Sequence, residues 1–333
     1  MNPNSPLFDK VLGCLLGGVI GDAMGTPTEK LSYDEIQQRF GWVQTFSGDG
    51  TDDSILKHIL CETLERTGGH ATADTWAEDW LRHSQTFLES KLFFVPVVAT
   101  FWKLRGEQVL PRDAGAGNMA SSSSAMCISP MGIVNAGNPR QAALETFEVA
   151  SLVHHNFCRD GACAMAAAVA QAFAPGADVE SVLRAASDFL PERSAGAMRA
   201  ALQSTLAMAR ESAGYEDFRA RYCSAAIDGR QHFTDSRETV PLALALVWLA
   251  DGNAQKAVEY GANFGRDADT IASMAGAVAG AMGGARALPQ AWLDTLGPQA
   301  DKQRALADRM TQLVRARAEA ARAAVLMVLE TSA

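Results

Sequence analysis

The sequence lacks the features that extracellular and membrane proteins usually show. Its six cysteines include no C-x-x-C pair, and no other His/Cys spacing suggests zinc, so we expect free thiols rather than disulfides or a zinc site. No apolar run reaches the roughly eighteen residues of a membrane span. The first six residues are polar and unlike a secretory signal. These absences predict a cytoplasmic protein with no membrane partner.

A basic surface and strand-forming segments are also missing. The formal net charge of −9 argues against nucleic acid as a partner bound through a positive surface. Valine, isoleucine and tyrosine never alternate with polar residues over a convincing length, whereas apolar residues recur at helical spacing nearly everywhere. With 333 residues, 48% of them hydrophobic, the chain has ample material for a core. Without a repeat or a linker, it is expected to form one all-α domain, and we expect a monomer.

Several helices can be placed from capping residues and helix-breaking residues. A first helix is expected over residues 8–22, where four glycines form a small-residue face for close packing. Thr51 is a good N-cap for a helix over residues 52–66. Pro241 is expected in the first turn of a helix over residues 242–249, where proline is tolerated. Residues 106–124 are expected to form a long loop, and loops of that length are usually functional.

Two polar clusters stand where helices are expected to begin, about two hundred residues apart in the chain. Their members are Thr51, Asp52 and Asp53 in the first cluster, and Asp267, Asp269 and Thr270 in the second. Carboxylates there are favoured by the helix dipole, and oxygen ligands are what Mg²⁺, Mn²⁺ and Ca²⁺ prefer. The alternative is that each cluster is an ordinary helix cap, although each has one acid more than capping needs.

The order of three motifs resembles a known family. Gly-Asp-Ala-x-Gly-x-Pro-x-Glu at 21–29, Thr-Asp-Asp-Ser at 51–54 and Gly-Arg-Asp-x-Asp-Thr-Ile-Ala at 265–272 strongly resemble the ADP-ribosylglycohydrolases. These include the dinitrogenase-reductase-activating glycohydrolase and the ADP-ribosyl-arginine and ADP-ribosyl-serine hydrolases. The resemblance implies an ADP-ribosylglycohydrolase-type domain over residues 8–297, a single-domain orthogonal multi-helix bundle. Residues 298–333 would then form a C-terminal helical extension packed on it.

The resemblance also implies a centre of two divalent cations, Mg²⁺ or Mn²⁺. The implied ligands are Thr51, Asp52, Asp53, Asp267, Asp269 and Thr270. Glu29 matches the family's glutamate that gates the site and positions or deprotonates water, and we name Glu29, Asp52 and Asp269 as candidate catalytic residues. Asp22 is expected to tie the first helix to neighbouring backbone rather than to bind metal.

One region departs from the family pattern. Relatives carry a Gly-Asn-Gly-x-Ala-Met-Arg loop facing the diphosphate, whereas this chain has four serines at 121–124 followed by Ala-Met and Cys127. Serine hydroxyls can bind phosphate, but the lost glycines restrict close backbone approach. The implied substrate-binding residues are Gly117, Asn118, Ser121, Ser122, Ser123, Ser124 and His154. The neighbouring His155 fits the family's histidine as well, although His154 is preferred, and a structural role in capping the preceding helix is an equal alternative.

Three functions therefore compete. The first is a metal-dependent hydrolase that cleaves the ribosidic bond of ADP-ribosylated protein side chains or a related ADP-ribosyl compound. The second performs the same chemistry on another N- or O-ribosyl compound, such as a nucleoside or nucleotide, and the altered serine loop motivates it. The third is a non-catalytic ADP-ribose-binding relative, against which the complete set of acids argues.

Overall fold

The computed structural model describes residues 5–226 and 232–331, and within these ranges every regular element is a helix. This confirms the all-α prediction. The α-helices are α1 (Pro6–Gly25), α2 (Tyr33–Phe40), α3 (Asp52–Arg66), α4 (Ala73–Arg82), α5 (Ser84–Glu89), α6 (Val95–Arg105), α7 (Ser129–Val134), α8 (Pro139–Val149), α9 (Phe157–Ala172), α10 (Val179–Asp188), α11 (Gly196–Glu211), α12 (Tyr215–Ala226), α13 (Ser236–Leu249), α14 (Ala254–Ala262), α15 (Ala268–Gly283), α16 (Gln290–Leu296) and α17 (Pro298–Thr331). Four single-turn 3₁₀ helices are η1 (Thr26–Thr28), η2 (Pro111–Asp113), η3 (Ala150–Leu152) and η4 (Ala285–Ala287).

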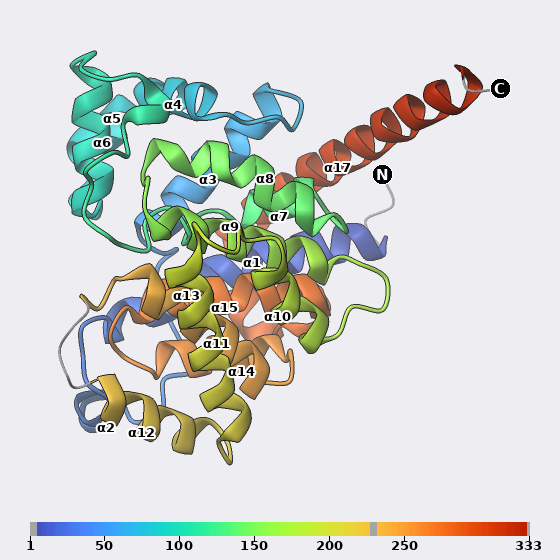
Figure 1. Ribbon diagram of the computed structural model, residues 1–333. Coiled ribbons are helices and arrows are strands. Elements are labelled where there is room, and N and C mark those ends of the chain that lie inside the picture. Colours follow the sequence, from blue (N-terminus) through green and yellow to red (C-terminus); the bar gives the residue numbers. More distant parts are fainter. Residues whose placement is uncertain (1–4, 227–231, 332–333) are drawn as a thin grey trace.

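Helices α1 and α15 form the centre of the bundle and run antiparallel in backbone contact (Figure 1). A Cβ added to Gly17 would overlap the carbonyl oxygen of Gly276, and a Cβ on Gly13 would overlap that of Gly280. Glycine at four-residue intervals leaves a flat face on each helix, so the two backbones approach without side chains between them. The pairing sets the end of α1 beside the start of α15.

Apolar and small side chains surround this pair. Helices α9, α13 and α14 pack against α15, and most of their buried residues are alanine, valine or leucine. The alanine-rich α9 contributes thirteen buried residues, which shows that it runs through the core rather than over it. The start of α15 is thereby held within the buried core.

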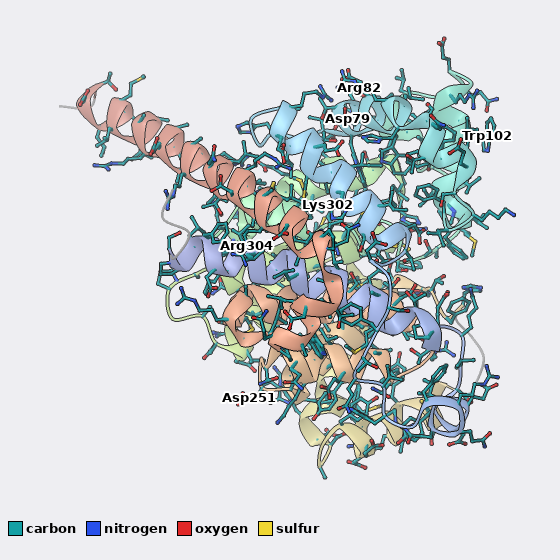
Figure 2. The ribbon with its side chains drawn as sticks, turned by 180° about the vertical axis from the view of Figure 1, so that it is seen from behind. Asp79, Arg82, Trp102, Asp251, Lys302 and Arg304 are labelled. Carbon is teal, nitrogen blue, oxygen red and sulfur yellow. The ribbon has the colours of Figure 1, made fainter. Side chains whose placement is uncertain are left out.

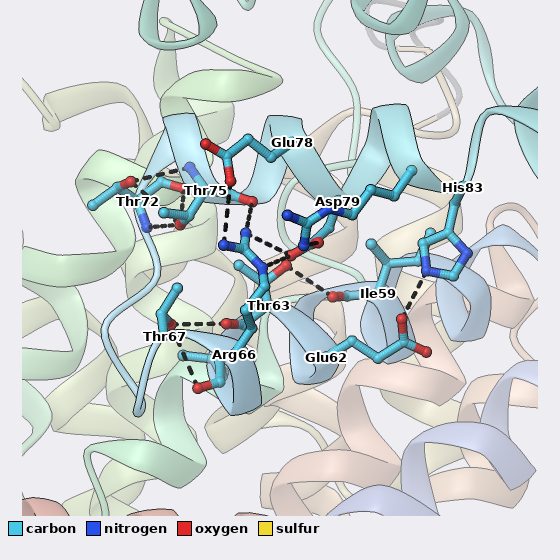
Figure 3. Close-up of polar contacts among 12 residues, drawn as sticks. Ile59, Glu62, Thr63, Arg66, Thr67, Thr72, Thr75, Glu78, Asp79 and His83 are labelled. Carbon is cyan, nitrogen blue, oxygen red and sulfur yellow. Dashed lines mark hydrogen bonds and ion pairs between the residues drawn. The ribbon is translucent and has the colours of Figure 1, made fainter.

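A second layer built on α4, α5 and α6 covers one end of α3 (Figure 1). Figure 3 shows Arg66 at the end of α3 donating to the carboxylate of Asp79 at 3.0 Å and to the carbonyl of Thr75 at 2.8 Å. A capping box between Thr72 and Thr75 starts α4. Further along α4, the buried rings of Trp76 and Trp80 meet edge to face at 5.3 Å.

The C-terminal segment is one long helix, α17, which crosses the back of the bundle where Lys302 and Arg304 are labelled (Figure 2). Its first half buries Leu306, Met310 and Val314. Arg317 then bonds to Glu145 of α8 at 2.7 Å. All residues from 318 to 331 are exposed, so the last four turns project from the body, as Figure 1 shows.

The structure corrects the expected place of Pro241. It lies inside α13, which begins five residues earlier at Ser236, rather than in a first turn. Asp235 caps the helix by accepting from the backbone N–H of Arg237, so the helix starts in a polar stretch that apolar periodicity overlooks. The short helices α2, α5, α7 and α16 were likewise not predicted. None of the described helices combines the length and apolarity needed to cross a membrane.

Candidate metal centre

The last turn of α1 is tied to the first turn of α3 through Asp22. This fully buried carboxylate accepts hydrogen bonds from the backbone N–H and hydroxyl of both Thr51 and Ser54, at 2.5–3.1 Å. The residue before Thr51 is Gly50, at φ +100°, and a Cβ there would overlap the Asp22 carboxylate. Asp22 thus makes the tie expected from the sequence and also brings α1 to the acid cluster.

The first turn of α3 presents Asp52 and Asp53 to the interior. One oxygen of Asp52 accepts from the backbone N–H of Phe94 at 3.1 Å. One oxygen of Asp53 accepts from the hydroxyl of Thr270 at 3.3 Å, which links α3 directly to α15. The hydroxyl of Thr51 makes no cap bond, because it donates to Asp22 instead. Capping therefore does not explain this cluster.

The second cluster lies at the start of α15. Asp267 occupies the N-cap position without a capping bond from its side chain, and it accepts from the hydroxyl of Ser122 at 2.9 Å. Asp269 accepts from the backbone N–H of Thr270 at 2.9 Å. Both carboxylates are almost fully buried.

The two clusters meet, as the sequence predicted. Ligand oxygens of Asp22, Asp53 and Asp269 lie within 4.8 Å of one another, and so do those of Glu29, Asp267 and Asp269. Asp269 belongs to both groups, so the carboxylates form two adjoining sets that share one member. Such a set of oxygen donors suits hard divalent cations.

Burial changes the acidity of the cluster. It raises the pKa of Asp52 to about 7 and that of Asp267 to about 8. Burial first, and then the neighbouring carboxylates, raise the pKa values of Asp53 and Asp269 well above their ordinary value. Carboxylates gathered this closely repel one another when ionised. A bound cation would favour their ionised forms.

One atom provides a direct test of fit for a metal. The second carboxylate oxygen of Asp53 is buried and has no hydrogen-bond partner. Buried carboxylate oxygens are normally bonded, because desolvation without a partner is costly. This oxygen belongs to the residue that contacts Thr270 and adjoins Asp269, so a cation between the clusters would complete its coordination. The residues present therefore fit a metal.

Glu29 lies at the accessible side of the cluster. Its side chain is 28% exposed and pairs with Lys30 at 3.0 Å. The backbone holds this loop in place, because Lys30 donates its N–H to the carbonyl of Arg266 and Arg266 donates to the carbonyl of Leu31. The loop carrying Glu29 is thus joined to the residue before Asp267.

The serine loop points its hydroxyls into the protein. The four side chains from Ser121 to Ser124 are at most 3% exposed. Ser122 bonds to Asp267, whereas Ser124 lies 2.9 Å from Nδ1 of His154. His154 is itself fully buried, and burial lowers its pKa to about 4, so the ring is neutral at physiological pH. The ring therefore supports the serine loop from within.

Two further predicted substrate residues lie on the loop before the serines. Gly117 is exposed at φ +76°. The side-chain amide of Asn118 donates to the hydroxyl of Thr100 and the carbonyl of Val153, and its oxygen accepts from Lys103. In this structure Asn118 organises the loop.

Sequence reasoning missed the residues that support the acids. The sequence predicted Ser122 as a substrate-binding residue, whereas in the structure its hydroxyl donates to Asp267. The Arg266 guanidinium forms a two-bond ion pair with the buried Glu238, and its backbone adopts φ +59°, a left-handed conformation that is uncommon for a side-chain-bearing residue. The arginine within this acid-rich motif could have indicated an ion pair, because an arginine beside buried acids usually pairs with a carboxylate.

The chain is similar to a known protein family and to several known proteins. The family model for ADP-ribosylglycohydrolase matches residues 3–322, which extends past Gly297 into α17. An uncharacterized Escherichia coli protein, YegU, is 27% identical, over 85% of this chain and 90% of its own length. The ADP-ribosylarginine hydrolase Tri1 of Pseudomonas putida is 26% identical, over 86% and 74%. The ADP-ribosyl-[dinitrogen reductase] glycohydrolase of Rhodospirillum rubrum is 22% identical, over 89% and 93%.

A solved structure described as an ADP-ribosylglycohydrolase-related protein complex superposes with a TM-score of 0.70. It is 21% identical and covers 92% of this chain and 99% of its own, and this likeness concerns the fold. Fold and site together define an all-α protein with a buried carboxylate centre. The chain belongs to the ADP-ribosylglycohydrolase family, and it is a hydrolase of glycosidic bonds.

Proposed function

We propose that this protein is a metal-dependent hydrolase that removes ADP-ribose from a modified protein side chain or a related ADP-ribosyl compound. The observation that carries the proposal is the pair of carboxylate groups sharing Asp269, with the unbonded oxygen of Asp53 between the helices. Two relatives are named for hydrolysis of ADP-ribosylarginine and of ADP-ribosylated dinitrogen reductase, which supports this class of substrate.

The proposed ligands are those expected from the sequence: Thr51, Asp52, Asp53, Asp267, Asp269 and Thr270. When bound, two Mg²⁺ or Mn²⁺ ions would hold the ribose hydroxyls and make a coordinated water more acidic. The protein supplies the orientation of these side chains. The N–H of Phe94 restrains Asp52, and the hydroxyl of Ser122 restrains Asp267.

Glu29 is proposed to accept the proton of the attacking water. It is the exposed member of the group with Asp267 and Asp269, so it can reach solvent and substrate. Cleavage of a ribosidic bond develops positive charge at the anomeric carbon. The surrounding carboxylates stabilise that charge, and the leaving group departs with a proton from solvent or from protonated Glu29.

A second candidate substrate class is a nucleoside or another N- or O-ribosyl compound. The inward-pointing, bonded hydroxyls of residues 121–124 favour it, since they are engaged with Asp267 and His154 rather than directed to a diphosphate. The third candidate, a protein that binds ADP-ribose without turnover, is disfavoured by the complete acid set. The monomeric state and the cytoplasmic location remain predictions.

The test is turnover with Mg²⁺ or Mn²⁺ on ADP-ribosyl-arginine, ADP-ribosyl-serine and a nucleoside panel, for the wild type and Asp269→Asn. Release of free ADP-ribose supports the first proposal, and activity on nucleosides alone supports the second. Asp269→Asn should lose at least about 10³-fold in turnover while remaining folded, because it belongs to both carboxylate groups. Full activity in that variant would overturn the two-cation centre.

A further inference from the structure

The structure contains a lysine where lysines are rarely found. Lys57 on α3 is fully buried, and it is the only lysine or arginine among the buried side chains of the described residues. Its ammonium donates to the hydroxyl of Ser273 at 3.1 Å. Burying a charge is costly unless an opposite charge compensates it. A single neutral hydroxyl is weak compensation, so the burial of Lys57 requires a further explanation.

The position of Lys57 relative to the acids supplies that explanation. Lys57 stands four residues after Asp53 on α3, and Ser273 stands three residues after Thr270 on α15. Residues at these spacings lie on the same face of a helix, one turn apart. The Lys57–Ser273 bond is therefore the second of two cross-links between the helices, one turn below the Asp53–Thr270 bond.

The chain also makes room for this ammonium. A Cβ added to Gly18 on α1 would lie 2.6 Å from Nζ of Lys57, so glycine there leaves the space that the ammonium occupies. Gly18 stands four residues before Asp22, so both lie on the same face of α1, one turn apart. The ammonium thus lies beside α1, the helix whose last turn carries Asp22.

We propose that Lys57 is a built-in counter-cation of the carboxylate cluster and a positioning residue that fixes α3 against α15. The inference rests on the proposed cation centre and goes beyond it. Five buried aspartates and one partly exposed glutamate meet at this place, and Lys57 lies one turn along α3 from Asp53, one of the five. It stabilises the protein before divalent cations bind and, by repulsion, weakens their binding.

The decisive variant is Lys57→Met, which keeps the length and apolar stem of the side chain and removes its charge. Its matched control, Ser273→Ala, removes the hydrogen bond and keeps the charge. In EDTA, Lys57→Met should melt at a clearly lower temperature than Ser273→Ala. In calorimetric titration it should bind Mn²⁺ at least ~10-fold more tightly than the wild type, because a like charge one or two helical turns from the cations is gone.

Ser273→Ala should bind Mn²⁺ as the wild type does. Equal Mn²⁺ affinity in Lys57→Met and the wild type would overturn the inference, as would equal loss of melting temperature in both variants. If the wild type binds no Mn²⁺, the proposed function fails, whereas the melts in EDTA still test Lys57.

If Lys57→Met does not fold, the double variant Lys57→Met/Asp53→Asn separates charge from packing. It removes one negative charge together with the positive charge. Recovery of soluble, cooperatively melting protein supports the counter-cation role. Failure to recover it assigns Lys57 a packing role and overturns the inference.

Discussion

The contact between α1 and α15 predicts that one methyl group will damage both stability and the acid centre. In Gly17→Ala the new Cβ would overlap the carbonyl oxygen of Gly276, which belongs to backbone and cannot rotate away. The two helices must then separate by on the order of 1 Å to restore van der Waals contact. Overpacking of this kind lowers the free energy of unfolding by about 3 kcal/mol, the upper end of its usual range. The cost is high because no flexible side chain can move to make room for the methyl group.

For a chain of this length that cost lowers the melting temperature by about 4 °C. The same separation moves Asp22 away from Asp269, so Mn²⁺ affinity should fall as well. Gly196→Ala is the matched control, because no heavy atom lies within 4 Å of its Cβ position in α11. We expect that variant to be as stable as the wild type or more stable by up to about 1 kcal/mol.

Differential scanning calorimetry and Mn²⁺ titration measure both effects. If Gly17→Ala melts with the wild type and binds Mn²⁺ equally well, the backbones of α1 and α15 are not in contact. In that case the reasoning that places Asp22 beside Asp269 is wrong.

Three further predictions concern the residues around the acids. Ser122→Ala should lower Mn²⁺ affinity ~10-fold with little change in melting, because Asp267 loses the donor that orients it; unchanged titration curves would contradict this. Burial lowers the pKa of His154 to about 4, so the neutral ring contributes fully to stability above pH 6.5. As the pH falls toward 4 this contribution is lost, and the free energy of unfolding decreases by ~3 kcal/mol. In urea unfolding, the free energy of unfolding of His154→Asn should fall between pH 7 and pH 4.5 by about that much less than that of the wild type. An equal fall in both proteins would refute this prediction. Arg266→Met should lower the free energy of unfolding by ~3–5 kcal/mol, because Glu238 stays buried without its ion-pair partner. The double variant Arg266→Met/Glu238→Met should recover most of this loss. Denaturant curves that show no recovery would refute the pairing.

The helical architecture was predictable because most of its causes are local. Helix α3 begins directly after Thr51, as predicted, and the glycines of α1 recur at a spacing that predicts close packing. The meeting of the two acid clusters followed from their composition and from the resemblance of ordered motifs. The helices and the acid clusters were predictable because their signals lie within one helical turn or one short motif.

The supporting residues depend on tertiary packing and were not predictable in the same way. Nothing in the sequence around Lys57 marks it as buried, because its burial results from α1 and α15 arriving from distant parts of the chain. The serine loop shows the same limit, since a hydroxyl can face a ligand or a neighbour. Here Ser122 faces Asp267. Pro241 was misplaced because the polar first turn of α13 has no apolar period to reveal it.

The central claim is that the starts of α3 and α15 together hold two hard cations. Anomalous diffraction from crystals soaked in Mn²⁺ tests it most directly. The account predicts two adjoining peaks, both bound by Asp269, with the second oxygen of Asp53 coordinating one of them. Peaks located only elsewhere, or no peak at this site at saturating Mn²⁺, would contradict it.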